Sequence, residues 1–88
     1  MFAGVPFIGE GVIHNLSHAG CRVECDRTVQ KGSYVTVRLL LPDHTTALIV
    51  ELAAIRWVRE GCFGIEFLRL PAFDQNRLDE FLIDYHRL

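Results

Sequence analysis

Hydrophobic and polar residues alternate along most of this chain, which is the pattern of β-strands with one buried face. The clearest case is 34–41, YVTVRLLL, where every second residue is aliphatic and lies on one face: Val35, Val37, Leu39 and Leu41. A longer apolar segment at 47–58 and an alternating segment at 63–68 follow it. Two shorter candidates, 11–14 and 21–25, precede it. The pattern therefore predicts five strands.

Turn-forming residues separate these segments. The Lys-Gly pair at 31–32 leads into the strand at 34–41, and Pro-Asp-His at 42–44 leads out of it. The Arg-Glu-Gly run at 59–61 has the composition of a tight hairpin turn. The Ala-Ala pair at 53–54 interrupts the bulkier residues of the longest strand, which indicates a bend or β-bulge.

The period of the apolar residues changes near the end of the chain. After Pro71, Asp74 is the expected N-cap of a helix. The apolar residues then recur at helical spacing and form one stripe: Leu78, Phe81, Leu82 and Tyr85. The acidic residues fall mostly off that stripe: Asp79, Glu80 and Asp84. We expect this stripe to pack over an open end or face of the sheet.

Together these elements predict an all-β, mainly antiparallel fold: a small β-barrel of five to six strands with one C-terminal α-helix. A length of 88 residues leaves room for a single domain, 1–88, and half of the residues are apolar, which is ample for a core. A net charge of −2 argues against DNA or RNA as a partner. No apolar run is long enough for membrane insertion, and three cysteines without framework spacing favour a cytoplasmic location.

The loop HNLSHAG, at 14–20, carries the polar residues of greatest interest. Asn15, Ser17 and Gly20 lie between two predicted strands. Asn and Ser side chains bond readily to nearby backbone, so one interpretation is a turn that serves the fold. The other is a ligand site, because a carboxamide offers a donor and an acceptor side by side and a hydroxyl donates to anions. The sequence leaves both interpretations open.

The same loop and the strand after it carry side chains typical of two further chemistries. His14, His18, Cys21 and Cys25 have the side-chain types of a zinc site, but the cysteines lie roughly 13 Å apart along an extended strand. Ser17 beside a histidine suggests a nucleophile, yet no acidic orienting residue or oxyanion hole accompanies it. We therefore predict no metal site, no cofactor and no enzymatic activity.

The pattern Asn15-x-Ser17-x-x-Gly20 resembles the (D/N)-x-S-x-x-G signature of the PilZ domain family. The Ile-Arg-Trp run at 55–57, a turn, and Gly-Ile-Glu-Phe at 64–67 resemble the paired strands of that family, which end in G-[VI]-x-F. The resemblance extends over almost the whole chain. It implies a barrel that binds the bacterial second messenger cyclic di-GMP, with Asn15 and Ser17 contacting the ligand and Gly20 shaping the turn.

The chain departs from the family pattern in one respect. Dinucleotide-binding members carry an R-x-x-x-R arm whose guanidinium groups clamp phosphates, and no two arginines of this chain are four residues apart. Arg56 and Arg59, beside a strand end, are the candidate replacement phosphate contacts, and the favoured interpretation of both is a solvated side chain. Without the arm we expect weak binding of cyclic di-GMP or none. Two functions follow: a nucleotide receptor, or a binding-incompetent adaptor that acts through protein contacts.

Two expectations concern apolar residues. Tyr34 and Trp57 are interpreted as barrel packing rather than as stacking platforms, because aromatic residues on strands are usually buried. The leading segment contains four large apolar residues and is too short for a full first strand plus an arm: Phe2, Val5, Phe7 and Ile8. We expect a homodimer or another protein partner to cover it.

Overall fold

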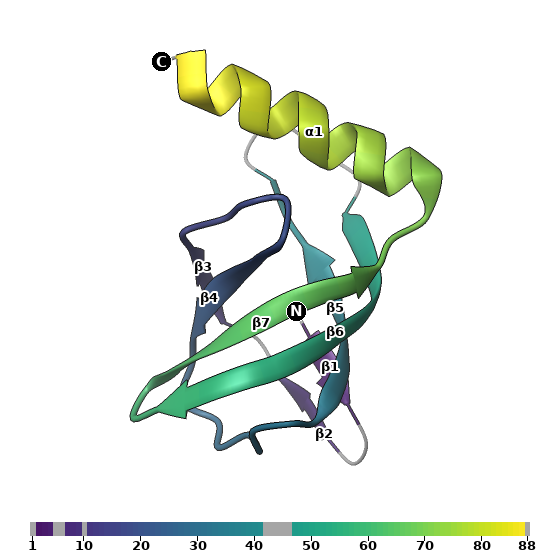
Figure 1. Cartoon of the computed structure of the whole chain (residues 1–88). Coiled ribbons are helices and arrows are strands. Elements are labelled where there is room, and N and C mark those ends of the chain that lie inside the picture. Colours follow the sequence, from purple (N-terminus) through teal and green to yellow (C-terminus); the bar gives the residue numbers. More distant parts are fainter. Residues whose placement is uncertain (1, 5–6, 10, 42–46, 88) are drawn as a thin grey trace.

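A computed structural model describes residues 2–4, 7–9, 11–41 and 47–87, and the side chains of 11–41 and 47–83. The chain forms one seven-stranded antiparallel sheet and a C-terminal helix (Figure 1). The elements are β1 (Phe2–Gly4), β2 (Phe7–Gly9), β3 (Val12–His14), β4 (Gly20–Glu24), β5 (Tyr34–Leu39), β6 (Leu48–Arg59), β7 (Cys62–Arg69) and α1 (Ala72–Arg87). The predicted fold class and its helix are confirmed.

The sheet has the strand order β2-β1-β5-β6-β7-β4-β3 and curls around its own core. Its two long central strands, β6 and β7, are joined by the tight turn predicted at 59–61, where Gly61 has a φ of 81°. The alternation along 34–41 is confirmed, because all four predicted aliphatic residues are buried. Core residues of β4, β6 and β7 complete the interior, among them Val23, Leu48, Val50, Ile55 and Phe63.

The strand count differs from the prediction at the start of the chain. Residues 2–9 were not predicted to form strands, yet β1 and β2 form a hairpin and β1 pairs with β5. Both strands have only three residues, and so short a segment gives no readable alternation. The pairing covers part of the β5 edge that the predicted shortened first strand would have left exposed. The side chains of this segment lie outside the described residues, and its predicted covering by a partner stays a prediction.

The helix begins two residues before the predicted N-cap. Asp74 is the third residue of α1, and its carboxylate accepts a hydrogen bond of 3.0 Å from the backbone N–H of Ile49 in β6. Asp74 therefore ties the helix to the sheet instead of capping it. Leu78 and Leu82 are fully buried against the core, and Phe81 packs against it in part, as predicted. Figure 1 shows α1 lying across one end of the curled sheet.

The turn predicted at 42–44 lies outside the described residues. Tyr85 is the last residue of the predicted stripe, and its side chain lies outside the described side chains. Within the described residues, no helix has the length and apolar character needed to cross a membrane.

Candidate functional site

The loop between β3 and β4 is a tight turn held by Ser17. The Ser17 N–H donates to the carbonyl of Gly20 at 2.9 Å, and the Ser17 hydroxyl donates to the same carbonyl at 3.2 Å. The hydroxyl oxygen also accepts from the N–H groups of Ala19 and Gly20, at 3.2 and 3.3 Å. A serine at this position satisfies several backbone groups that strand pairing leaves free. Ser17 therefore has a clear structural role.

Gly20 is required by the close approach of β4 to β7. It pairs with Glu66, and a Cβ atom at Gly20 would overlap the backbone carbonyl of Ile65. Because that neighbour is backbone rather than a flexible side chain, the overlap has no easy relief. The glycine of the signature thus serves sheet packing, and it opens β4 directly after the turn.

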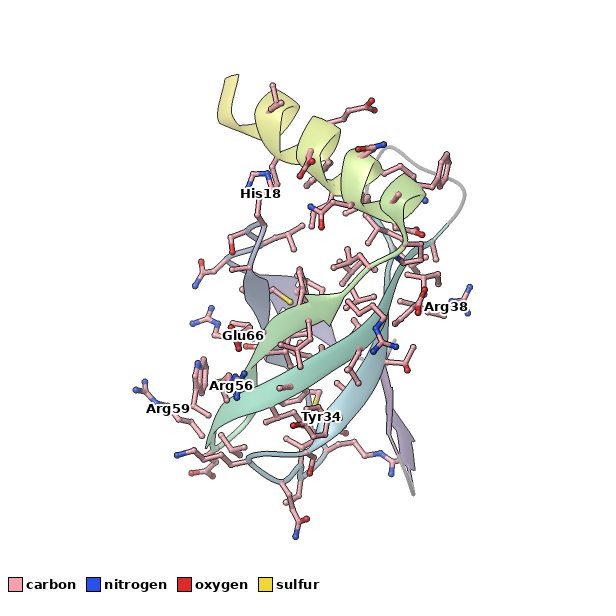
Figure 2. All side chains as sticks on the ribbon, turned by 45° about the vertical axis from the view of Figure 1, so that its right-hand side comes forward. His18, Tyr34, Arg38, Arg56, Arg59 and Glu66 are labelled. Carbon is pink, nitrogen blue, oxygen red and sulfur yellow. The ribbon has the colours of Figure 1, made fainter. Side chains whose placement is uncertain are left out.

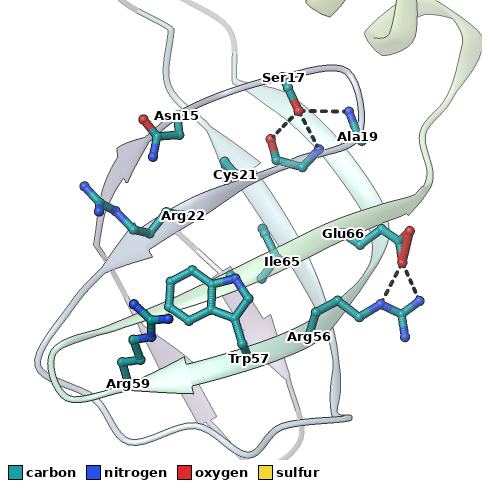
Figure 3. A pocket seen from close by; sticks show the side chains of 12 residues that line it. Asn15, Ser17, Ala19, Cys21, Arg22, Arg56, Trp57, Arg59, Ile65 and Glu66 are labelled. Atoms are coloured by element: carbon teal, nitrogen blue, oxygen red, sulfur yellow. Dashed lines mark hydrogen bonds and ion pairs between the residues drawn. The ribbon is translucent and has the colours of Figure 1, made fainter.

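Asn15 is the signature residue whose side chain remains available. Its backbone has a φ of 54°, a left-handed conformation that Asn tolerates better than most residues. The side chain is exposed, and within the described residues its carboxamide has no hydrogen-bond partner. Both its donor and its acceptor therefore face solvent beside the sheet (Figure 3).

Trp57 lies on the outer face of the sheet, so its predicted role in barrel packing is wrong. The register of β6 against β7 shifts between Ile55, which pairs with Ile65, and Trp57, which pairs with Gly64. This bulge leaves Arg56 as the extra residue and turns the next side chain to the opposite face. The bend predicted at 53–54 is also present, as a second register shift between Leu52 and Ala53.

The Trp57 indole lies against Gly64, which makes room for it. A Cβ atom at Gly64 would overlap the indole Nε1, so only glycine allows the ring to rest on β7 in this position. Trp57 keeps 36% of its surface exposed. Tyr34 is also exposed, at 62%, because it alternates with the inward-facing Val35. The expectation that Tyr34 is buried is therefore also wrong.

Arginines from two strands lie near the indole. Arg22 of β4 pairs with Gly64 across the sheet and shares its outward face, and the guanidinium carbon of Arg59 lies 5.4 Å from the centre of the indole ring. Figure 3 shows Arg22 and Arg59 on the same side of Trp57. Among the described residues, neither arginine forms an ion pair. Two positive charges near the ring therefore have no acidic partner in the part of the chain that the structure describes.

Arg56 differs from these two arginines because it is engaged. Its Nε donates to the Glu66 carboxylate at 2.6 Å, and its Nη2 pairs with the same oxygen. Both side chains are about half exposed. Arg56 thus lies in the same region as Arg59, but an acidic partner occupies its donors.

All of the predicted site residues line one open concavity of about 960 Å³ on the outer face of the sheet. The structure therefore brings the loop motif, Asn15, Ser17 and Gly20, together with Arg56 and Arg59. Arg22 and Trp57 also line it and were not predicted as site residues. Alternation offered one signal for Arg22, since it lies between two inward residues of a predicted strand. No sequence signal identified the bulge that turns Trp57 outward.

The histidines and cysteines of the loop region do not share one site, because their side chains have different neighbours. His14 Nε2 lies 3.8 Å from a Glu24 carboxylate oxygen, and His18 reaches the helix. Cys21 is buried, and burial raises the pKa of its thiol to about 12. Within the described residues, no three His, Cys, Asp or Glu side chains converge as a metal site would require.

Comparison with known proteins identifies the family. The chain is similar in fold to the PilZ domain of CeSA from a cellulose-synthesizing bacterium, with a TM-score of 0.72 and 18% sequence identity over 97% of this chain and 88% of that one. No curated protein sequence matches the chain. The family model of the PilZ domain matches residues 6–84, nearly the whole chain. The chain therefore belongs to the PilZ domain family, a family of cyclic di-GMP receptors.

Proposed function

We propose that this PilZ domain is a module of bacterial cyclic di-GMP signalling that binds the dinucleotide weakly in the concavity beside the loop motif. One observation carries the proposal: Arg22 and Arg59, without acidic partners among the described residues, lie beside an exposed indole in the concavity that the signature residues line. A doubly anionic ligand with planar bases matches such a surface, since aromatic rings stack on bases and guanidinium groups bind phosphates.

Six of the residues that line the concavity have a defined role in this proposal. Trp57 offers the exposed part of its indole to a guanine ring. Arg22 and Arg59 meet the phosphates, and the Asn15 carboxamide hydrogen bonds with a purine edge. Ser17 and Gly20 contribute by holding the turn that presents Asn15. The reaction is binding alone, and no enzymatic step is proposed.

Binding is expected to be weak for two reasons. The 88 residues contain no R-x-x-x-R pair, and each charge-assisted hydrogen bond lost removes roughly 1.5–3 kcal/mol. Arg56, one of the two predicted replacements, donates to Glu66 instead. Arg22 and Arg59 replace the lost charge, but they project from separate strands rather than from one arm.

The second candidate function is an adaptor that acts through protein contacts without binding the nucleotide. It is favoured by the Ser17 hydroxyl, which is fully used inside its own turn. Large apolar side chains also remain exposed on the helix, Phe73 at 70% and Ile83 at 52%. In this case the signature would persist because the turn needs it.

Calorimetric titration with cyclic di-GMP separates the two functions, and quenching of Trp57 fluorescence gives a second readout because the chain has no other tryptophan. We expect saturable binding with a dissociation constant above the low-micromolar range, together with quenching. Guanosine monophosphate serves as the control ligand. Absence of saturation at millimolar cyclic di-GMP would support the adaptor. Sedimentation tests the predicted homodimer, which a 10.0 kDa monomer at high concentration would contradict.

A further inference from the structure

His18, inside the signature loop, contacts the C-terminal helix. Its Nε2 lies 3.1 Å from the Oδ1 atom of Asp79 in α1. Figure 2 shows His18 extending from the loop toward the side of the helix that faces the sheet. The loop that presents Asn15 to the concavity therefore also touches α1.

The loop side of this contact is held firmly. Ser17 and Gly20 close the turn around His18 and Ala19, and the Ala19 carbonyl accepts a hydrogen bond of 2.7 Å from the N–H of Phe67 in β7. A turn tied at both ends has few internal adjustments available. A shift of this loop is therefore passed on to the side chain of His18 rather than absorbed within the turn.

The helix side is anchored earlier along α1. Asp74 accepts from the Ile49 N–H, and Arg77 donates to the Ala47 carbonyl at 3.2 Å, so the start of the helix is joined to the start of β6. Asp79 follows these anchors and also accepts from Gln75 at 3.0 Å. Its contact with His18 is thus a separate attachment, which joins α1 to the other side of the sheet.

We infer that the His18–Asp79 contact couples the signature loop to α1, so that occupation of the concavity is transmitted to the helix. The transmission by ligand rests on the function proposed above, whereas the coupling itself does not. A ligand shifts a conformational equilibrium only by the difference in its affinity for the two states. Because both side chains are substantially exposed, the pair is weak, and we expect a coupling of about two- to fivefold.

The first experiment needs no ligand. Amide hydrogen exchange of α1 is measured in wild type, Ser17→Ala, Asp79→Ala and the double variant. Loosening the turn by Ser17→Ala should speed exchange of the helix amides about twofold to fivefold in wild type but not in the Asp79→Ala background. If Ser17→Ala raises the exchange rate of the α1 amides equally in the wild-type and Asp79→Ala backgrounds, or in neither, the coupling is overturned.

Two further variants keep this experiment decisive. His18→Ala removes the imidazole and alters only an exposed side chain, so it provides the same cycle with Asp79→Ala if Ser17→Ala unfolds the domain. Glu80→Ala is the matched control, since it removes the same charge one residue along the helix and Glu80 forms no hydrogen bond or ion pair with the described residues. Exchange in Glu80→Ala should follow wild type, and an equal response to Glu80→Ala and Asp79→Ala would refute a specific contact.

The second experiment measures the affinity for cyclic di-GMP in wild type, Asp79→Ala and Glu80→Ala. Asp79→Ala should change the dissociation constant about twofold to fivefold and Glu80→Ala should leave it unchanged. Unchanged affinity in Asp79→Ala, with wild type binding, would contradict transmission to the helix. If wild type fails to bind, the proposed function fails, and the exchange experiment still decides the coupling.

Discussion

The two sides of the concavity use their polar groups in opposite ways. On the loop side, the Ser17 hydroxyl bonds within its own turn and Gly20 is fixed by the approach of β7. On the strand side, Arg22 and Arg59 have no acidic partner among the described residues, and Trp57 exposes its ring. The signature residues therefore mostly build the surface, whereas residues outside the signature offer the free contacts.

This difference has a simple physical origin. A turn leaves backbone N–H and C=O groups unpaired, and nearby polar side chains satisfy them. In a sheet the ladder already pairs the backbone, so outward-facing side chains are not needed for it. Asn15 is the exception on the loop side, because its contribution to the turn is its left-handed backbone and not its carboxamide.

The largest expected effect is on the loop side. Gly20→Ala places a Cβ atom against the Ile65 carbonyl, so we expect the free energy of unfolding to fall by about 3 kcal/mol or more. Urea denaturation measures it. Gly61→Ala is the comparison, since its Cβ would meet no atom and only backbone strain of about 1–2 kcal/mol applies. Similar losses in both variants would show that Gly20 is not sterically required.

The next largest expected effect comes from removing the Trp57 indole on the strand side. Trp57→Ala should weaken cyclic di-GMP binding by about tenfold or more, because stacking of one base contributes about 1–3 kcal/mol. Since Trp57 is partly exposed, urea denaturation should show a much smaller loss of stability than Gly20→Ala. Gly64→Ala should reproduce the binding loss by displacing the indole. Wild-type affinity in Trp57→Ala would remove the ring from the site.

The charges of the strand side give a comparable but salt-dependent effect. Arg22→Ala and Arg59→Ala should each weaken binding by about tenfold at low ionic strength, and by less at high salt where charges are screened. Calorimetry at two salt concentrations measures both effects. Arg27→Ala is the matched control, because Arg27 is exposed and does not line the concavity. Equal effects of all three substitutions would indicate only a general dependence on net charge.

The smallest expected effect concerns the Arg56–Glu66 ion pair, in which an arginine of the strand side already has an acidic partner. Glu66→Gln releases Arg56 toward the concavity, so we expect affinity for cyclic di-GMP to rise a few-fold. Stability should change by at most about 1 kcal/mol, as is usual for exposed ion pairs. Titration and urea denaturation of the same variant check both values. A decrease in affinity would mean that Glu66 itself contacts the ligand.

Local sequence patterns were sufficient for most of the fold. The alternation at 34–41, the hairpin turn at 59–61 and the stripe with Leu78 and Leu82 all appear as predicted. These features depend on which face of a strand or helix is apolar, and burial of that face dominates folding energetics. The signature at 15–20 likewise indicated the PilZ family, to which the chain belongs.

Only the tertiary structure decided how the site is composed. The bulge at Arg56 turns Trp57 outward, and the pairing of β4 with β7 places Arg22 in the same row as Gly64. Arg56 pairs with Glu66, which lies 10 positions later in the sequence (66 − 56). His18 contacts Asp79, which lies 61 positions later (79 − 18). Strand register and packing determine which residues become neighbours. A local pattern along the chain contains no information on either of them.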